Sequence, residues 1–467
     1  MNLTLLTDFY ELTMLAGYFE LGKTSEKATF DLFFRKIPSQ GGFCIAAGLE
    51  DAIDYIKNLH FSREDIEYLY SLKTFSADFL EYLREFSFSG ELYAVPEGTL
   101  VFPNEPLIRI TAPLAEAQFL ETALLNIIGF QTLIATKAAR ICLSARGKEV
   151  IEFGARRAQG PDGAMSASRA SYIGGCSSTS NTLAGKKFEI PVQGTMAHSW
   201  IQSFDTELEA FEKYARVFPV SSLFLVDTYD TIEGVKNAIR IGLKLKEEGK
   251  RLKGIRLDSG DLKKLSIEAR KLLDEAGLEE AKIVASNDLD EWIVQDLLSQ
   301  GAQIDIFGVG TSLVISRDAP ALGVVYKLVA IEKDGKVCPK IKISGNIEKI
   351  TNPGVKKIVR FLNKEKLVGD VLMLEDEKAY SPMATFDQFH SHKRKTISGT
   401  FEEILQPIFL EGKLFYKNPA LPEIRQRTLN QLDLLDEEYK RLLNPEIYWL
   451  GLSKKLFRLK QGLLREH

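Results

Sequence analysis

The run GIRLDSGD at residues 254–261 contains the pattern on which the predicted fold rests. Its first half is apolar apart from Arg256, as in a short buried strand, and its second half is a polar tip that ends at Asp261. A helix is predicted next, because apolar residues recur at helical spacing over 262–273 and Gly277 ends the pattern. A strand, a polar tip and a helix in this order form the unit from which parallel sheets are built.

The same unit recurs between residues 149 and 330. Each apolar run ends in a polar or glycine-rich tip, and amphipathic segments follow several of them. The apolar runs are residues 150–151, 223–226, 254–257, 283–285 and 304–307. Strands that alternate with helices predict a parallel sheet, either open or closed into a barrel. Polar chemistry at every tip favours a (β/α) barrel, because a barrel gathers the carboxyl ends of all its strands around one mouth.

Capping side chains mark four predicted helix starts, one of them at Thr231, before apolar residues at helical spacing. Asp8 with Glu11, and Asp288 with Glu291, have the three-residue spacing of a capping box. Asp261 stands directly before an apolar pattern at helical spacing and is predicted to cap that helix.

Composition is that of a globular protein, with 45% hydrophobic and 27% charged residues in 467. The formal net charge is −4, which argues against a broad nucleic-acid-binding surface. Four cysteines without a CxxC pair disfavour a disulfide framework or a cysteine zinc site. No apolar run approaches the ~18 residues of a membrane span, and the first ten residues lack a signal-peptide pattern. We therefore expect a cytoplasmic protein without nucleic-acid or membrane partners.

His198 is the most informative of the five histidines. It lies in the run GTMAHSW at residues 194–200, after the apolar residues 190–192. A buried core histidine is as good an interpretation as a functional one, and a metal ligand is disfavoured because no second His or Cys lies at ligand spacing. A nucleophilic or acid–base role fits a position at a strand end.

Other tips carry candidate residues that also have structural interpretations. Asp258 could hold Mg²⁺ or sugar hydroxyls, whereas its neighbour Asp261 needs only to cap a helix. Arg156 suits a bidentate contact with carboxylate or phosphate, although surface arginines are common. The run GVGT at residues 308–311 either lets backbone N–H groups approach a phosphate or simply makes a tight turn. The run HSHKR at residues 390–394 is more typical of a solvated loop than of a metal or phosphate site.

Five segments occur together in an order and spacing that resemble the nicotinate phosphoribosyltransferase family. They are TDFYELTM at residues 7–14, EFGARR at 152–157, GTMAHS at 194–199, IRLDSGD at 255–261 and FGVGT at 307–311. The resemblance covers about residues 1–360. It implies that nicotinate and 5-phosphoribosyl 1-diphosphate give nicotinate mononucleotide and diphosphate in the salvage synthesis of NAD. It also implies coupling to ATP hydrolysis through a phosphohistidine, with Mg²⁺ at the diphosphate.

The architecture implied by the resemblance is that of type II phosphoribosyltransferases. It is an α/β fold with an irregular (β/α) barrel packed on a discontinuous α/β domain, within a homodimer that shares its active sites. We assign residues 1–113 to the N-terminal α/β domain, completed by about 332–380, and residues 114–331 to the barrel. Residues 381–467, which have charged helical patterning, are assigned to a C-terminal extension.

Family roles transfer residue by residue onto the matching motifs. His198 would accept the phosphoryl group, Thr195 would lie against nicotinate, and Arg256 would belong to the nicotinate and phosphoribosyl site. Asp258 would bind ribose hydroxyls or Mg²⁺-diphosphate. The 5′-phosphate would be cradled by Gly308, Gly310 and Thr311.

The nicotinate ring would be held between two aromatic side chains. Tyr10, often from the partner subunit in this family, would stack on one face, and Phe153 would supply the other. Arg156 would supply the positive charge for the carboxylate.

Three alternatives remain at this point. Quinolinate phosphoribosyltransferase has the same fold, but its dicarboxylate pocket needs more basic residues and it needs neither the histidine motif nor ATP. The nicotinamide enzyme has an Asp in the region that matches residues 174–181, where this chain has hydroxyls, including Thr179 and Ser180, that suit a carboxylate. An inactive barrel that serves as a scaffold would be expected to lack several polar tips, and all of them are present.

Overall fold

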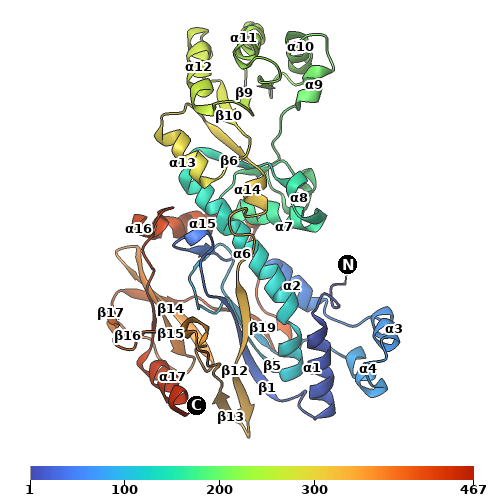
Figure 1. Ribbon diagram of the computed structural model, residues 1–467, viewed down its shortest axis with the longest axis vertical. Helices are drawn as coiled ribbons and strands as arrows, with labels where there is room; N and C mark the ends of the chain where they lie inside the picture. The colour runs from blue at the N-terminus through green and yellow to red at the C-terminus, as the bar shows by residue number, and fades with distance from the viewer. Residues whose placement is uncertain (1, 467) are drawn as a thin grey trace. The chain divides into compact units, whose positions relative to one another are not determined.

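A computed structural model describes residues 2–466, and the chain divides into two compact units (Figure 1). One unit contains the chain up to Leu133 and again from Ala321 onward, so it is discontinuous in sequence. The other contains Ile134–Pro320. The barrel assignment of 114–331 was therefore longer at both ends than the second unit, whose first boundary falls inside one long helix, α6 (Glu121–Ser144).

The second unit is built on six parallel strands. They are β6 (Glu149–Glu152), β7 (Ser178–Thr179), β8 (Leu223–Leu225), β9 (Gly254–Leu257), β10 (Lys282–Ala285) and β11 (Ile306–Val309). Their order in the sheet is β7-β6-β11-β10-β9-β8. Because β11 pairs with β6, the strands follow each other around the sheet in chain order, as in an α/β barrel.

One side of this ring stays open in the described part of the chain. A parallel bridge between Thr179 and Val192 extends the sheet beyond β7, but no ladder joins that segment to β8. The α/β fold class is confirmed, and the strand order is that of a barrel whose hydrogen bonding is interrupted between residue 192 and β8.

Helices cover the outer face of the curved sheet. The larger ones are α7 (Gly160–Ile173), α10 (Glu207–Val217), α11 (Thr231–Glu247), α12 (Leu262–Glu275) and α13 (Glu291–Ser299). Figure 1 shows α10, α11 and α12 side by side next to β9. Ile255 and Leu257 on β9 pack into the core shared with these helices. Side chains alternate along a strand, so Arg256 between them faces the inside of the curved sheet.

The inner face has a small apolar core of its own. Four buried side chains from four strands form it, with Phe153 packed against them: Ile151, Leu223, Val284 and Ile306. These side chains line the inside of the sheet around a cavity of about 50 Å³, and polar groups gather beyond them at the carboxyl ends of the strands.

Helix caps agree with the sequence at one of the four predicted positions. The cap predicted at Thr231 is wrong, because Thr231 is the first residue of α11 and Asp230 caps that helix. Asp261 caps α12 by accepting the Lys264 N–H at 3.0 Å. At α1 (Phe9–Glu20), Asp8 stands at the cap position but accepts a bond from Thr122 Oγ1 instead of from the helix backbone. The capping box predicted at Asp288 is wrong, because Asp290 caps α13 and Glu291 pairs with buried cations.

Two sheets form the core of the first unit. The larger runs β13-β12-β1-β5-β3-β19-β20 and is antiparallel throughout. Its strands are β1 (Lys27–Phe34), β3 (Glu91–Ala94), β5 (Ile108–Pro113), β12 (Val324–Lys333), β13 (Lys336–Pro339), β19 (Gln406–Leu410) and β20 (Lys413–Leu414). Around it lie α1, α2 (Leu49–Lys57), α3 (Arg63–Ser71), α4 (Ala77–Arg84), α5 (Leu114–Phe119) and the first part of α6.

The second sheet of this unit runs β17-β16-β21-β15-β14-β18. Its strands are β14 (Lys356–Asn363), β15 (Lys366–Leu374), β16 (Met383–Asp387), β17 (Arg394–Ile397), β18 (Thr400–Glu403) and β21 (Leu450–Leu452). The helices of this region are α15 (Leu421–Leu434), α16 (Glu437–Lys440) and α17 (Lys454–Glu466). Strands β14 and β15 pair with each other as an antiparallel hairpin.

The predicted C-terminal extension at 381–467 is not a separate segment. Strand β19 pairs with β3, β18 pairs with β14, and β21 lies between β15 and β16. These strands are short and find their partners far along the chain, so local periodicity could not reveal them.

One helix in the part of the chain that the structure describes, α6, is long and apolar enough to span a membrane by length and composition. Of its most apolar stretch, 78% is buried inside the protein. Such burial is that of a core helix.

Candidate active site

Polar side chains collect at the carboxyl ends of the strands in the second unit. Eleven of the twelve residues singled out in the sequence lie in this unit: Phe153, Arg156, Thr179, Ser180, Thr195, His198, Arg256, Asp258, Gly308, Gly310 and Thr311. The twelfth, Tyr10, lies in the first unit, in the opening turn of α1.

Arg256 and Asp258 form the centre of the strand-end site. Arg256 Nη2 donates to Asp258 Oδ1 at 2.7 Å, and its Nε donates to Ser286 Oγ at 2.7 Å. Arg256 Nη1 reaches Thr195 Oγ1 at 3.4 Å, and the guanidinium carbon lies 5.5 Å from the centre of the Phe153 ring. The arginine side chain is 14% exposed. Its charge is thus held in a defined direction at the mouth, on top of an aromatic ring.

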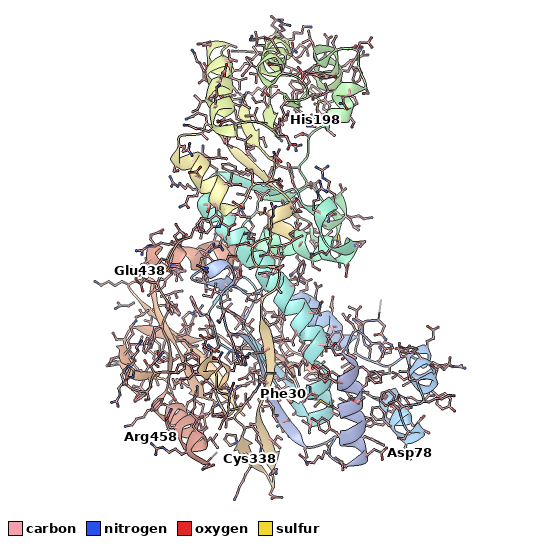
Figure 2. The ribbon with its side chains drawn as sticks, viewed as in Figure 1. Phe30, Asp78, His198, Cys338, Glu438 and Arg458 are labelled. Carbon is pink, nitrogen blue, oxygen red and sulfur yellow. The ribbon has the colours of Figure 1, made fainter. Side chains whose placement is uncertain are left out.

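His198 begins the short helix α9 (His198–Gln202) and is labelled in Figure 2. Its Nδ1 lies 3.1 Å from Thr228 Oγ1, and its Nε2 lies 4.0 Å from Asp258 Oδ2. The side chain is 41% exposed, which excludes the alternative of a buried core histidine. In the tautomer in which Nδ1–H donates to Thr228, the Nε2 lone pair is available on the side of Asp258.

Asp227 supports the same site from the end of β8. Its Oδ2 accepts the Asp258 N–H at 2.9 Å and the Ser259 hydroxyl at 2.6 Å. Its other oxygen, Oδ1, is buried and has no hydrogen-bond partner in the described residues. The sequence shows Asp227 as a polar tip but gives no signal that separates it from a residue that only orders a loop.

The carboxylate oxygens at this site suit a magnesium ion that also binds a substrate phosphate. Asp227 Oδ1 and Asp258 Oδ2 accept no hydrogen bond from described residues, and both are hard carboxylate oxygens. Within residues 2–466, no group of three His, Cys, Asp or Glu side chains could hold a metal ion. Mg²⁺ usually binds through one or two carboxylates together with water and substrate phosphates, so two oxygens fit it.

Gly308 within β11 and Gly310 directly after it have a packing role that the sequence did not reveal. A Cβ on Gly308 would come within 2.6 Å of the Phe153 ring, so only glycine lets that ring lie against the strand. Gly310 stands next to the Phe153 carbonyl and precedes α14 (Thr311–Val314). The tight-turn interpretation of residues 308–311 is therefore satisfied whatever else this loop binds.

Arg156 and Thr179 differ in whether their side chains already form hydrogen bonds within the described residues. Arg156 is exposed on the turn Ala155–Arg157 and forms no hydrogen bond or ion pair with described residues. Thr179 is buried, and its hydroxyl donates to Glu152 Oε2 at 2.5 Å. The Ser180 N–H donates to the Glu152 carbonyl at 2.9 Å.

Tyr10 presents an aromatic ring on the surface of the first unit. Its side chain is 46% exposed in α1. Partial burial, together with the Glu121 and Glu11 carboxylates, raises the pKa of the Tyr10 phenol, so the ring stays neutral.

Three family models together match most of the chain. They are the nicotinate phosphoribosyltransferase N-terminal domain over residues 5–129, the nicotinate phosphoribosyltransferase family over 149–368, and the nicotinate phosphoribosyltransferase C-terminal domain over 355–460. The C-terminal match includes most of the segment that the motifs in the sequence did not reach.

Individual relatives agree with these matches. The chain is 48% identical over 473 residues to nicotinate phosphoribosyltransferase of Bacillus subtilis (strain 168), covering 100% of this chain and 96% of the relative. It is 38% identical to nicotinate phosphoribosyltransferase of Caenorhabditis elegans, covering 98% and 93%. The crystal structure of human nicotinic acid phosphoribosyltransferase superposes with a TM-score of 0.86 at 32% identity, covering 98% of this chain and 99% of that one.

Proposed function

The chain belongs to the nicotinate phosphoribosyltransferase family, and on that premise we propose that it converts nicotinate and 5-phosphoribosyl 1-diphosphate to nicotinate mononucleotide and diphosphate. ATP hydrolysis drives the transfer through a phosphorylated His198, and the product enters NAD synthesis. One observation carries the proposal: an accessible imidazole nitrogen, an Arg–Asp pair and an unpartnered carboxylate oxygen meet at one end of the parallel sheet.

The transfer step needs charge stabilisation on both sides of the bond that breaks. When diphosphate leaves C1 of the ribose, positive charge develops on the sugar and negative charge on the leaving group. Arg256 supplies a positive group at the mouth, and Asp258 Oδ2 with Asp227 Oδ1 would hold Mg²⁺. When bound, Mg²⁺ neutralises charge on the diphosphate.

Nicotinate is positioned by an aromatic face and a cation. Phe153 provides the face at the mouth, and Arg156 on the next turn is unpaired and suits the carboxylate as a bidentate partner. Holding the ring in this way aims its nitrogen at C1, so that the reaction begins from an aligned pair of atoms. The 5′-phosphate is assigned to the loop of Gly308, Gly310 and Thr311, and Thr195 to the nicotinate side.

ATP coupling is assigned to Nε2 of His198. Its lone pair attacks the γ-phosphorus of ATP, a nitrogen–phosphorus bond forms, and the bond from the γ-phosphorus to the ADP oxygen breaks. The new phosphoryl group would carry negative charge close to Asp258, which lies 4.0 Å from the unmodified nitrogen. That repulsion links phosphorylation to the carboxylates that face the diphosphate. Water later hydrolyses the phosphohistidine and restores the free imidazole.

Diphosphate release tests the substrate and the coupling together. We expect release with nicotinate, faster with ATP than without it, and little release with nicotinamide or quinolinate. Equal rates with and without ATP would contradict the coupling. Preference for quinolinate or nicotinamide would contradict the proposed substrate, and no release with any of the three would contradict the enzymatic function.

We also propose that the active enzyme is a homodimer in which Tyr10 closes the site of its partner. The exposed Tyr10 ring lies in a different unit from the other site residues, and an aromatic lid must come from outside the barrel. Removal of the ring would cost about 0.5–1.5 kcal/mol of binding beyond area burial.

Mixed dimers separate action on the partner from action within the chain. Subunits with Tyr10→Ala are combined with subunits with His198→Ala, so that a mixed dimer has one intact site if Tyr10 acts on the partner. ATP-coupled activity should reappear in verified mixed dimers. Activity that stays at the level of the parents would contradict a shared site.

A further inference from the structure

Glu152 occupies the end of β6 and is the most deeply buried acid at the strand ends. Its side chain is 0% exposed. Oε1 accepts the Gly154 N–H, and Oε2 accepts the Ser168 hydroxyl at 3.0 Å and the Thr179 hydroxyl at 2.5 Å. No lysine or arginine in the described chain forms an ion pair with it. One carboxylate therefore joins three elements: the turn that carries Phe153, helix α7 and strand β7.

Burial of a charged carboxylate at this position costs folding free energy that a neutral residue would not. Burial of a carboxylate without a cation is unfavourable unless several donors satisfy it. The donors to Glu152 supply that compensation: they are Gly154, Ser168 and Thr179, and with Phe153 and Asn181 these residues are called the nicotinate wall below. The wall is thus organised around an acceptor that cannot donate.

Glu152 fixes the direction of the Thr179 hydrogen bonds in this wall. Thr179 gives its only proton to Glu152, so its oxygen accepts the Asn181 N–H at 3.0 Å. The Ser168 hydroxyl has two acceptors within reach, Glu152 Oε2 at 3.0 Å and the Ala164 carbonyl at 2.9 Å, and its oxygen accepts from Asn181 Nδ2 at 3.2 Å. Asn181 Oδ1 accepts the Ala184 N–H at 3.2 Å, which caps α8 (Thr182–Phe188). The amide of Asn181 is therefore held in one orientation.

We propose that Glu152 is a positioning residue that sets the shape and hydrogen-bond polarity of the nicotinate wall. The inference deepens the proposed function and rests on it. The Glu152 carboxylate holds the Phe153 ring through the Gly154 N–H, and it takes the Thr179 proton away from the ligand. The nicotinate carboxylate is consequently recognised by Arg156, and the hydroxyls of this wall serve to fix its geometry.

Replacement of Glu152 by glutamine tests this role with little change of shape. A glutamine side chain can still accept the Gly154 N–H through its oxygen, but its NH₂ then faces two hydroxyl donors. We expect KM for nicotinate to rise at least tenfold, with kcat at saturating nicotinate and KM for 5-phosphoribosyl 1-diphosphate changed less than threefold. A fall in kcat at unchanged KM, or equal changes for both substrates, would overturn the proposal.

Glu149→Gln is the matched control on the same strand. Glu149 begins β6 and accepts from Ser177 Oγ and Gln193 Nε2, each at 2.8 Å, so it also binds a hydroxyl and an amide. It lies at the amino end of the strand, away from the mouth. KM for nicotinate should stay within twofold of the wild type, and a rise equal to that of Glu152→Gln would overturn the proposal.

Thr179→Val keeps the proposal testable if Glu152→Gln does not fold. This near-isosteric change removes one donor to Glu152 and should raise KM for nicotinate in the same direction by a smaller factor. With both changes, KM should match that of Glu152→Gln alone, because the two residues act through one bond. Multiplied effects would mean that Thr179 contacts nicotinate directly, against the proposal.

The wild type in the same assay distinguishes failure of the proposed function from failure of the positioning role of Glu152. No nicotinate-dependent diphosphate release by the wild type would overturn the proposed function itself. Normal wild-type turnover with unchanged KM for nicotinate in Glu152→Gln and Thr179→Val would overturn the positioning role alone.

Discussion

Two arginine–aspartate pairs, one in each unit, have nearly the same length and opposite surroundings. In the first unit, Arg360 Nη2 lies 2.6 Å from Asp370 Oδ2, and both side chains are 0% exposed. In the second unit, Arg256 Nη2 lies 2.7 Å from Asp258 Oδ1, with the side chains 14% and 29% exposed. A charge pair alone therefore does not mark a functional site.

The two pairs differ in whether their polar atoms still lack hydrogen-bond partners. Arg360 also donates to the Leu100 carbonyl at 2.9 Å and to Gln431 at 3.2 Å, and Asp370 accepts the Tyr448 hydroxyl at 3.0 Å. This network is saturated and closed to solvent. At the mouth, Asp258 Oδ2 is left without a donor. The first arrangement holds a sheet together, whereas the second is prepared for a ligand.

Loss of the buried cation should have the largest effect. Arg360→Met leaves the Asp370 carboxylate in the core without its cation, which is expected to cost about 3–5 kcal/mol of stability. The midpoint of urea unfolding, followed by circular dichroism, measures the loss. Arg256→Met is the matched control and should cost less than about 1 kcal/mol. Equal losses in the two variants would remove the distinction between the pairs.

Asp258→Asn should have the opposite signature, with activity lost and the fold kept. Asparagine can still accept from Arg256, but the charge that faces His198, and that would face a bound Mg²⁺, is gone. We expect turnover to fall about 10²–10³-fold, or roughly 3–4 kcal/mol, with an unchanged unfolding midpoint. Asp261→Asn in the same tip should retain turnover within about twofold, since asparagine caps helices as well as aspartate. A comparable loss of turnover in Asp261→Asn would mean that Asp258 has no special role.

Arg156 offers a cation that has no acidic partner among residues 2–466, so its loss should alter the selectivity between nicotinate and nicotinamide. Arg156→Ala is expected to remove about 1.5–3 kcal/mol of nicotinate binding and narrow the margin over nicotinamide ten- to a hundredfold. The ratio of kcat/KM values for the two substrates measures this margin. The exposed neighbour Arg157 provides the control, and Arg157→Ala should leave the ratio within threefold. If Arg157→Ala narrowed the ratio and Arg156→Ala did not, Arg157 would be the residue that recognises the carboxylate.

Glu11 differs from both pairs, because it is a buried acid in the first unit with no arginine partner among the described residues. Burial raises the pKa of Glu11 to about 7, with the Glu121 carboxylate adding to the effect and the Gln118 hydrogen bond opposing it. Between pH 4.5 and 7 the folded protein holds a proton that the unfolded chain releases, so stability falls as pH rises through this range.

Substitution of Glu11 isolates that contribution. Glu11→Gln should flatten the dependence and gain about 1–2 kcal/mol relative to the wild type at pH 8, with little difference at pH 4.5. Urea unfolding at the two pH values without substrates is the measurement. A difference that is the same at both pH values would show that Glu11 does not titrate in this range.

The strand-end site was easier to predict from the sequence than the buried network around Arg360. Each strand, polar tip and helix of the second unit is made of residues that are neighbours in the sequence. His198, Arg256 and Asp258 stand within short runs whose apolar and polar residues already indicate a strand end. Asp370 lies ten residues from Arg360 on the facing strand of a hairpin, and Leu100 and Gln431, which complete the network, come from distant segments. Glu152 was visible only as the first residue of a polar tip, and its donors could be identified only in the folded chain.

Phosphorylation of His198 is the central claim, and its direct measurement is the transfer of label from [γ-³²P]ATP to the protein. The account predicts acid-labile, base-stable phosphate on the wild type and none on His198→Ala. It also predicts that the variant still forms nicotinate mononucleotide slowly, at a rate that ATP does not change. Acid-labile label on His198→Ala, or faster product formation by that variant when ATP is added, would contradict the account.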